Sequence, residues 1–201
     1  MVLGVRGSQY RKFTNKRLAD RWIAERLGRK RAHPTDSVPS KIQRTESGAQ
    51  GTTVIYTDGS ALGNGQRGAR AGFGVWFGHD DPRNVSEPLA GERQTNQRAE
   101  VMAGIRALEI VRDDASVRAV IIKTDSRYLV DSATSWMPGW RRANFKHVLN
   151  ADLMQRLDQL MCAVQPRVLL CFEHVRAHVG EAGNEAADTL ARAGARRRVV
   201  Q

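Results

Sequence analysis

The order of apolar segments constrains the fold of this 201-residue chain more than any single residue does. Three segments rich in β-branched and aromatic residues come first, at 52–57, 71–78 and 84–89. Helical and strand patterns then alternate, with strands expected at 117–124 and 168–175 and helices at 94–112, 125–140, 150–164 and 181–195. Pro138 should break the second of these helices. Strands separated by helices pair in parallel, whereas strands joined by short turns pair antiparallel. The pattern therefore predicts an α/β fold with a five-stranded mixed β-sheet flanked by helices.

Positive charge is concentrated in the first quarter of the chain. The formal net charge is +11, and residues 1–50 hold 12 Lys+Arg against 4 Asp+Glu, a net of +8. A charge excess of this kind favours a polyanionic partner, most simply nucleic acid. Residues 1–28 combine basic residues with a short expected strand and a helix, and residues 29–51 have the composition of a linker. We therefore expect the main domain to occupy residues 52–201.

Three further features bear on where the protein works. The sequence contains no run of eighteen apolar residues and no recognisable signal segment, so we expect no membrane association. Cys162 and Cys171 lie in apolar surroundings, which favours buried free thiols over a disulfide or a metal site. These features predict an intracellular protein, without choosing between cytoplasm, nucleus and mitochondrion.

Four acidic residues have settings that favour a common site. Asp58 and Asp125 each follow an expected strand, and Glu100 and Asp188 lie in expected helices. Either aspartate alone is more simply read as a turn or helix cap. If the two strands are parallel neighbours, however, both carboxylates emerge at the same edge of the sheet. Four carboxylates this close require cations, and pairs of Mg²⁺ or Mn²⁺ ions held by carboxylates cleave phosphodiesters.

The order and local sequence of these acids resemble type 1 ribonuclease H over about residues 51–195. The matching motifs are YTDGS around Asp58, TNQRAE ending at Glu100, TDS around Asp125 and GNEAAD ending at Asp188. The resemblance implies that these four acids bind two Mg²⁺ ions, with Mn²⁺ as an alternative. It also implies hydrolysis of the RNA strand of RNA–DNA hybrids, leaving 5′-phosphate and 3′-hydroxyl ends. His178 would assist proton transfer or the release of product and metal.

The resemblance further implies how each strand of a hybrid is recognised. Asn64, Asn96 and Gln97 match positions that meet the 2′-hydroxyls of RNA. The residues expected at the DNA strand are those of a phosphate pocket and an aromatic that packs on sugars: Arg93, Thr95, Asn150 and Trp136. For Trp136 and Trp140, core packing is the alternative. The loop between Trp140 and Asn150 is shorter than is usual in the family.

The basic N-terminal segment resembles part of the small hybrid-binding module found ahead of many such enzymes. Tyr10, Arg11 and Lys12 match the positions that meet nucleic acid. The first strand of that module has no counterpart, so the alternative is a flexible basic arm.

Two other functions are compatible with the same scaffold. A non-catalytic hybrid-binding protein is disfavoured because all four acids are present. A DNA-cutting nuclease is disfavoured by the set of Asn64, Asn96 and Gln97, which suits RNA sensing. The sequence therefore predicts a monomeric, metal-dependent endoribonuclease whose partner is an RNA–DNA hybrid.

Overall fold

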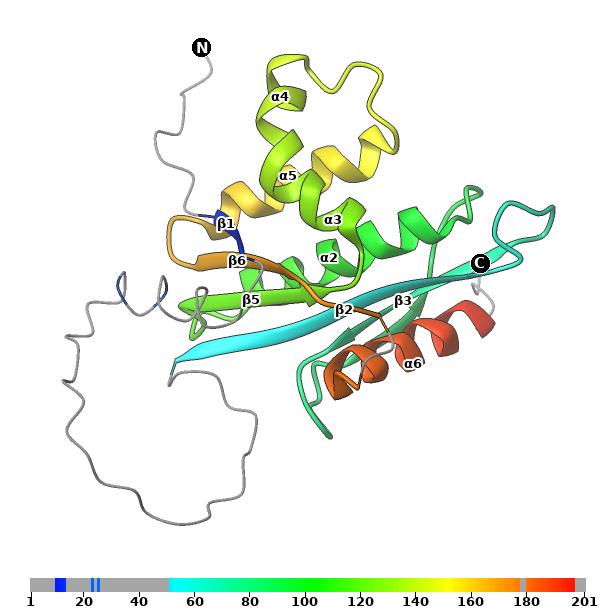
Figure 1. Ribbon diagram of the computed structural model, residues 1–201, viewed down its shortest axis with the longest axis horizontal. Coiled ribbons are helices and arrows are strands. Elements are labelled where there is room, and N and C mark those ends of the chain that lie inside the picture. The colour runs from blue at the N-terminus through cyan, green and yellow to red at the C-terminus, as the bar shows by residue number, and fades with distance from the viewer. Residues whose placement is uncertain (1–9, 14–22, 24, 26–50, 178–179, 198–201) are drawn as a thin grey trace.

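A central mixed sheet organises the chain. The computed structural model describes residues 10–13, 23, 25, 51–177 and 180–197. The sheet has the strand order β1-β6-β5-β2-β3-β4 (Figure 1). Its strands are β1 (Tyr10–Phe13), β2 (Thr52–Leu62), β3 (Arg70–Trp76), β4 (Val85–Pro88), β5 (Ala119–Thr124) and β6 (Leu169–His174). The α/β fold with five predicted strands is confirmed, and β1 adds a sixth strand at the edge of the same sheet.

As predicted, strands joined by short turns pair antiparallel and strands separated by helices pair in parallel. β2 pairs antiparallel with β3, and β3 with β4, because short loops connect them. β5 pairs in parallel with β2 and with β6, and β1 pairs in parallel with β6. The helices are α2 (Asn96–Asp113), α3 (Arg127–Asp131), α4 (Met137–Arg142), α5 (Ala151–Val164) and α6 (Ala182–Arg196), with a π-helical turn, η1, at Ser132–Trp136.

Helices cover both faces of the sheet, with α2 and α5 on one side and α6 on the other (Figure 1). Glycines permit the closest contacts. A Cβ atom at Gly59 of β2 would overlap the backbone of Glu100 in α2. On the opposite face, a Cβ at Gly72 or Gly74 of β3 would overlap the backbone of α6. Successive residues of a strand point to opposite faces, so these glycines bring both helices directly onto the sheet.

The side chains of β5 point alternately to the two faces of the sheet and belong to two separate core clusters. Val120 and Ile122 point into the main core, which is closed by side chains from α2, α5 and β6. Ala119 and Ile121 point the other way and pack with Cys171. Ile23, only 1% exposed, belongs to this second cluster. The N-terminal segment thus contacts the sheet both at β1 and at Ile23. Cys171 is a buried free thiol as predicted, and Cys162 is a free thiol of intermediate burial.

Two segments differ from the sequence expectation. β2 continues through Asp58 to Leu62 instead of ending before Asp58, because residues 56–62 keep pairing with β3. The helix expected at 125–140, with a break at Pro138, is divided into α3, η1 and α4, so the interruptions fall before the proline rather than at it. Pro138 lies in the first turn of α4, where its missing N–H costs little, and the π-helical turn precedes it.

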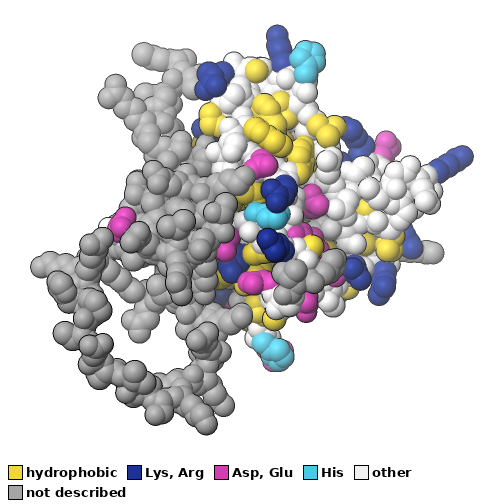
Figure 2. All heavy atoms as spheres, viewed as in Figure 1, with side chains coloured by type: hydrophobic (Ala, Val, Ile, Leu, Met, Phe, Trp, Pro, Cys, Tyr) yellow, Lys and Arg dark blue, Asp and Glu magenta, His cyan; other side chains and the backbone are white. Residues whose placement is uncertain are grey.

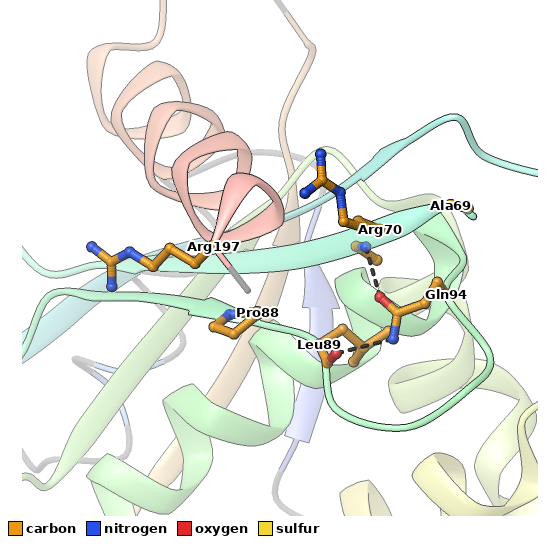
Figure 3. A pocket seen from close by; sticks show the side chains of 7 residues that line it. Ala69, Arg70, Pro88, Leu89, Gln94 and Arg197 are labelled. Atoms are coloured by element: carbon orange, nitrogen blue, oxygen red, sulfur yellow. Dashed lines mark hydrogen bonds between the residues drawn. The ribbon is translucent and has the colours of Figure 1, made fainter. Parts of the chain in front are cut away.

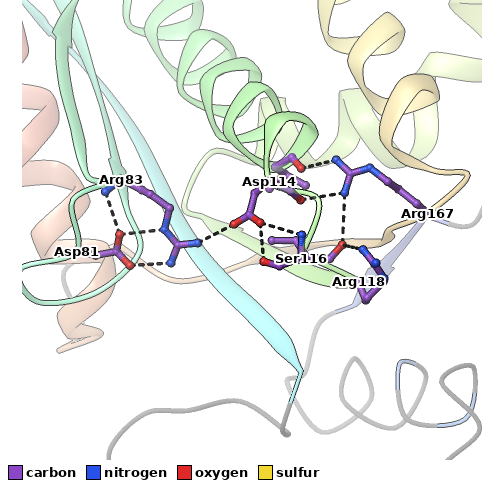
Figure 4. A network of polar contacts seen from close by, with 8 residues as sticks. Asp81, Arg83, Asp114, Ser116, Arg118 and Arg167 are labelled. Carbon is purple, nitrogen blue, oxygen red and sulfur yellow. Dashed lines mark hydrogen bonds and ion pairs between the residues drawn. The ribbon is translucent and has the colours of Figure 1, made fainter.

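A polar network holds the end of α2 that is remote from Glu100 (Figure 4). Arg83 binds both carboxylate oxygens of Asp81 and reaches Asp114, which follows α2. Arg167 donates to the carbonyl oxygens of Val111, in the last turn of α2, and of Asp114, directly after it. A cation at a helix C-terminus is also favoured by the helix dipole. The loops on this side are therefore fixed independently of the acidic site.

None of the helices in the described part of the chain has the length and apolar character needed to cross a membrane.

Candidate active site

Asp58 and Asp125 occupy equivalent positions on neighbouring parallel strands. The register pairs Tyr56 of β2 with Lys123 of β5, and each aspartate lies two residues further along its strand. β5 ends at Thr124, whereas β2 continues, so Asp58 lies beside the point where the sheet opens. The two side chains therefore emerge at one site, as the sequence predicted, although Asp58 is within its strand.

Asp58 experiences the charges of the other three acids. It is 7% exposed, and its pKa is raised from an ordinary 3.8 to about 8. Burial is the largest cause, followed by the charge of Asp125, with further contributions from Asp188 and Glu100. The backbone N–H of Gly59 donates a 2.8 Å hydrogen bond to Asp58 and opposes the shift. The other three predicted acids therefore lie within electrostatic reach of Asp58.

Glu100 is oriented by two donors. The amide of Asn96, one helical turn earlier, donates to Oε1 at 2.8 Å, and the hydroxyl of Ser126 donates to Oε2 at 2.6 Å. Burial raises the pKa of Glu100 and the charge of Asp125 adds to it, while these two hydrogen bonds lower it. Ser126 was not predicted to have a role. Its position directly after Asp125 was the available signal.

The first turns of α6 supply the remaining contacts. The buried Asn184 donates from Nδ2 to Oδ2 of Asp125 at 3.1 Å. Asp188, one turn later, accepts a 2.9 Å hydrogen bond from Nε of Arg192. Asn184 lies one helical turn before Asp188 in the GNEAAD motif, but no local sequence pattern indicates its bond to Asp125. The helix thus reaches the site through an amide and a carboxylate.

The acids interact but do not form a closed ligand shell. Among the residues that the structure describes, no three His, Cys, Asp or Glu side chains are gathered as a site for a single metal ion. Glu100, Asp125 and Asp188 instead face the donors Asn96, Ser126, Asn184 and Arg192. Mutual repulsion of carboxylates favours such an arrangement.

The predicted RNA-side residues cluster at the start of α2. The exposed Asn64, in the β2–β3 turn, accepts a 3.2 Å hydrogen bond at Oδ1 from the backbone N–H of Asn96. Asn96 in turn contacts Glu100, so a continuous chain of contacts links the turn to the acids. Gln97 is exposed beside them.

Two of the predicted DNA-side residues are joined by an arginine that the sequence analysis missed. Thr95 caps α2 by accepting from the backbone N–H of Arg98 at 3.3 Å, and Asn150 accepts from Nη1 of the same residue at 3.4 Å. Arg98 also binds both carboxylate oxygens of Asp152. Asn150 is 5% exposed and has a left-handed backbone (φ 56°). Arg93 is exposed nearby in sequence, two residues before Thr95.

Trp136 is a surface residue, 42% exposed, and packs against Tyr128 and Trp140 with ring centroids 6.2 and 5.6 Å away. Trp140 is less exposed and packs against the main core. Apolar side chains are visible at the surface in this part of the molecule, bordered by basic ones (Figure 2). The short loop that follows contains Asn144, Phe145 and His147 with positive φ.

Several predicted residues cannot be placed. His178 lies outside the described residues. The backbone of Tyr10, Arg11 and Lys12 pairs with β6, but their side chains are outside the description. The structure therefore neither supports nor contradicts the roles expected for these four residues.

A pocket of about 280 Å³ lies away from the acids, between the start of β3, the end of β4 and the end of α6 (Figure 3). Its lining includes Arg70, Leu89 and Arg197. Gln94 spans its wall, accepting from the Ala71 N–H and donating to the Leu89 carbonyl. None of the four acids lines it.

A sheet of this order, with four interacting acids at its open edge, defines the class of protein, and comparisons with known proteins agree. The RNase H family model matches residues 50–196. Ribonuclease H of Schizosaccharomyces pombe is 47% identical over 147 residues, 71% of this chain and 52% of that protein. Ribonuclease H of Maricaulis maris is 41% identical over 149 residues, 71% of this chain and 93% of that protein. This chain belongs to the RNase H family.

A solved structure supports the same assignment. LC9-RNase H1, described as a type 1 RNase H with the type 2 active-site motif, matches with a TM-score of 0.51 and 29% identity over 73% of each chain. The chain spans about half the length of the first curated relatives it matches, including Ribonuclease H1 of Homo sapiens.

Proposed function

We propose that this chain hydrolyses the RNA strand of RNA–DNA hybrids, leaving 5′-phosphate and 3′-hydroxyl ends. The observation that carries the proposal is the arrangement at the open edge of the sheet: Asp58 and Asp125 lie two residues beyond register partners of β2 and β5, Ser126 donates to Glu100, and Asn184 donates to Asp125. The raised pKa of Asp58, to which Asp125, Asp188 and Glu100 contribute, agrees with this arrangement. Membership of the RNase H family supports the same chemistry.

The donor set fits divalent cations. A buried carboxylate whose pKa is raised by neighbouring acids, as that of Asp58 is, is stabilised when a cation replaces a proton, and hard oxygen ligands suit Mg²⁺ or Mn²⁺. Asp58, Glu100, Asp125 and Asp188 would hold two such ions. When bound, a pair of ions activates a water and stabilises the departing oxygen. The protein contributes the orientation of its carboxylates through Asn96, Ser126 and Asn184.

The two strands would be distinguished by different surfaces. Asn64, Asn96 and Gln97 lie beside Glu100 at the start of α2 and offer amides to the RNA 2′-hydroxyls. Thr95, Asn150 and Arg93 are proposed to hold a DNA phosphate, with Arg98 linking the first two. The exposed ring of Trp136 is proposed to pack against DNA sugars.

His178 is proposed to assist proton transfer or the release of product and metal, without acting as a principal ligand. A His178→Ala variant tests this by slowing turnover while leaving Mg²⁺ binding, measured by calorimetry, unchanged. Tyr10, Arg11 and Lys12 are proposed to contact the hybrid from the edge of the sheet. The protein is proposed to act inside the cell as a monomer.

The function is tested with end-labelled RNA–DNA hybrid, double-stranded RNA and double-stranded DNA of one sequence, each with Mg²⁺, Mn²⁺ or EDTA. We expect cleavage of the RNA strand of the hybrid alone, only with a divalent ion. Asp125→Asn is the matched inactive control because it keeps the side-chain shape and removes one charge. Cleavage of double-stranded DNA, or cleavage of hybrid in EDTA, would contradict the proposal.

A further inference from the structure

Directly behind the two aspartates, a second polar contact joins the same two strands to the same helix. Tyr56 and Lys123 are register partners on β2 and β5, each two residues before its aspartate. Residues two apart on a strand share a face, so each of these side chains precedes a catalytic carboxylate on the same side of the sheet.

Both side chains bind one carboxylate oxygen of α6. The hydroxyl of Tyr56 donates to Oε1 of Glu181 at 2.6 Å, and Nζ of Lys123 donates to the same oxygen at 3.0 Å. Tyr56 and Lys123 are each 5% exposed. The Lys123 ammonium also lies 5.2 Å from the centre of the Tyr56 ring. A buried ammonium requires such a partner, because an unpaired charge in this environment is strongly unfavourable.

Glu181 is the N-cap of α6, the residue directly before Ala182. Its backbone carbonyl accepts from the N–H groups of Asn184 and Glu185, which form the first turn of the helix. Positions 181, 184 and 188 lie on one face of the helix, since side chains three to four residues apart are neighbours. On that face, Glu181 contacts Tyr56 and Lys123, and Asn184 contacts Asp125. The negative charge of Asp188, on the same face, acts on Asp58.

Backbone packing at the same point leaves little freedom for the helix. Gly183 is buried, and a Cβ atom there would overlap the ring of Tyr56. The ring therefore sets how closely the first turn approaches β2, while the Glu181 carboxylate sets the position of that turn along the strands. A shift of α6 along its axis would break both contacts with Glu181.

We infer that Tyr56, Lys123 and Glu181 are positioning residues that set the register of α6 on the sheet, and thereby the positions of Asn184 and Asp188 relative to Asp58 and Asp125. The inference rests on the proposed function for its catalytic consequence. The positioning of α6 by these three residues does not depend on that function.

The variants follow from the geometry. Glu181→Gln keeps the shape and an acceptor for Tyr56 but removes the charge that pairs with Lys123. Lys123→Met removes the ammonium with a side chain of similar length, and the double variant removes both charges, a replacement that buried ion pairs often tolerate. Glu185→Gln is the matched control, because it is the same substitution in the same helical turn at an exposed position.

Three measurements are made on the whole chain: amide hydrogen exchange without metal, Mg²⁺ affinity by calorimetry, and kcat and KM on RNA–DNA hybrid. In Glu181→Gln and Lys123→Met we expect faster exchange in the first two turns of α6, with β5 unchanged. We expect Mg²⁺ affinity and kcat to fall about tenfold while KM stays near the wild-type value, as when partners behind metal ligands are removed. The double variant should be no worse than the more affected single one, because the residues share one network.

Glu185→Gln should match the wild type in all three measurements. Wild-type exchange in α6 together with wild-type Mg²⁺ affinity in both single variants would overturn the inference. So would faster exchange spread uniformly over the molecule, which would indicate a loss of global stability only. If the wild type fails to cleave hybrid, the proposed function fails, and the exchange data still decide the role of the network.

Discussion

The Ser126 hydroxyl donates a 2.6 Å hydrogen bond to Glu100, joining the residue directly after Asp125 to a carboxylate of α2. The same oxygen accepts from the backbone N–H of Leu129 at 3.1 Å and so caps α3. One side chain therefore has two separable effects, on the orientation of Glu100 and on the stability of the helix start.

Replacing Ser126 with Ala should affect both. Loss of an orienting partner behind a metal ligand is expected to lower kcat about 10- to 100-fold. Loss of the helix cap should lower the free energy of unfolding by about 1 kcal/mol. Steady-state kinetics and urea unfolding measure the two effects. Ser126→Thr retains a hydroxyl and serves as the control, and unchanged kcat in Ser126→Ala would show that Glu100 needs no such partner.

Asp58→Asn should abolish cleavage while leaving the fold intact, because it removes a carboxylate at the centre of the site. It should also change the pH dependence of stability in EDTA. Folding raises the pKa of Asp58 to about 8, so the wild type loses stability as pH rises from about 4 towards 8. The variant lacks this loss. Each unit of pKa difference corresponds to about 1.4 kcal/mol, so the variant should be more stable by several kcal/mol at pH 9.

Thermal unfolding of both proteins in EDTA between pH 4 and 9 checks this expectation. The two stability curves should converge at the acid end and separate towards pH 8. Parallel curves across the range would mean that Asp58 is not buried among like charges. Near-normal turnover of the variant would remove Asp58 from the proposed catalytic set.

Gly59→Ala should be strongly destabilising, because its Cβ would overlap the backbone of Glu100 in α2. Overpacking of this kind usually costs about 1–3 kcal/mol, and backbone against backbone leaves few ways to relax. Gly78→Ala is the control, since a Cβ there meets nothing within 4 Å. Equal unfolding midpoints for the two variants in guanidinium chloride would show that α2 can move away from β2 at little cost.

The sequence predicted most of the elements and the proximity of the other three acids to Asp58, and the reasons are local. The metal-binding and catalytic roles of these acids stay predictions. Strand and helix periodicity identified β2, β5 and α6, and the position of Asp125 after a buried strand needed no further information. The end of β2 was wrong because antiparallel pairing with β3, a tertiary interaction, extends the strand past Asp58. The contacts of Arg98 with Asn150 and of Lys123 with Glu181 join residues far apart in the chain, so no local sequence pattern predicts them.

Deleting residues 1–50 should weaken hybrid binding and also lower stability. The deletion removes a net charge of +8, so fewer counterions are released on binding and the salt dependence of affinity becomes shallower. It also removes the pairing of β1 with β6 and the buried contact of Ile23 with Ile121 and Cys171. Filter binding of Asp125→Asn forms across a salt series measures the first effect, and thermal unfolding measures the second.

The four acids and strands β2–β6 lie beyond the cut, so the shortened chain should still fold and cleave. An unchanged salt slope would mean that the N-terminal segment does not contact the hybrid. Unchanged stability would mean that its contacts with the sheet contribute little in solution.

The position of β1 also bears on how separate copies of the chain meet. An uncovered β6 would present a row of unpaired backbone groups along an apolar strand, and such an edge is a template for pairing with another molecule. In the full chain this edge is occupied by residues 10–13 of the same molecule. A form that begins at residue 51 should therefore self-associate at concentrations where the full chain stays dispersed, which light scattering of the two forms would detect.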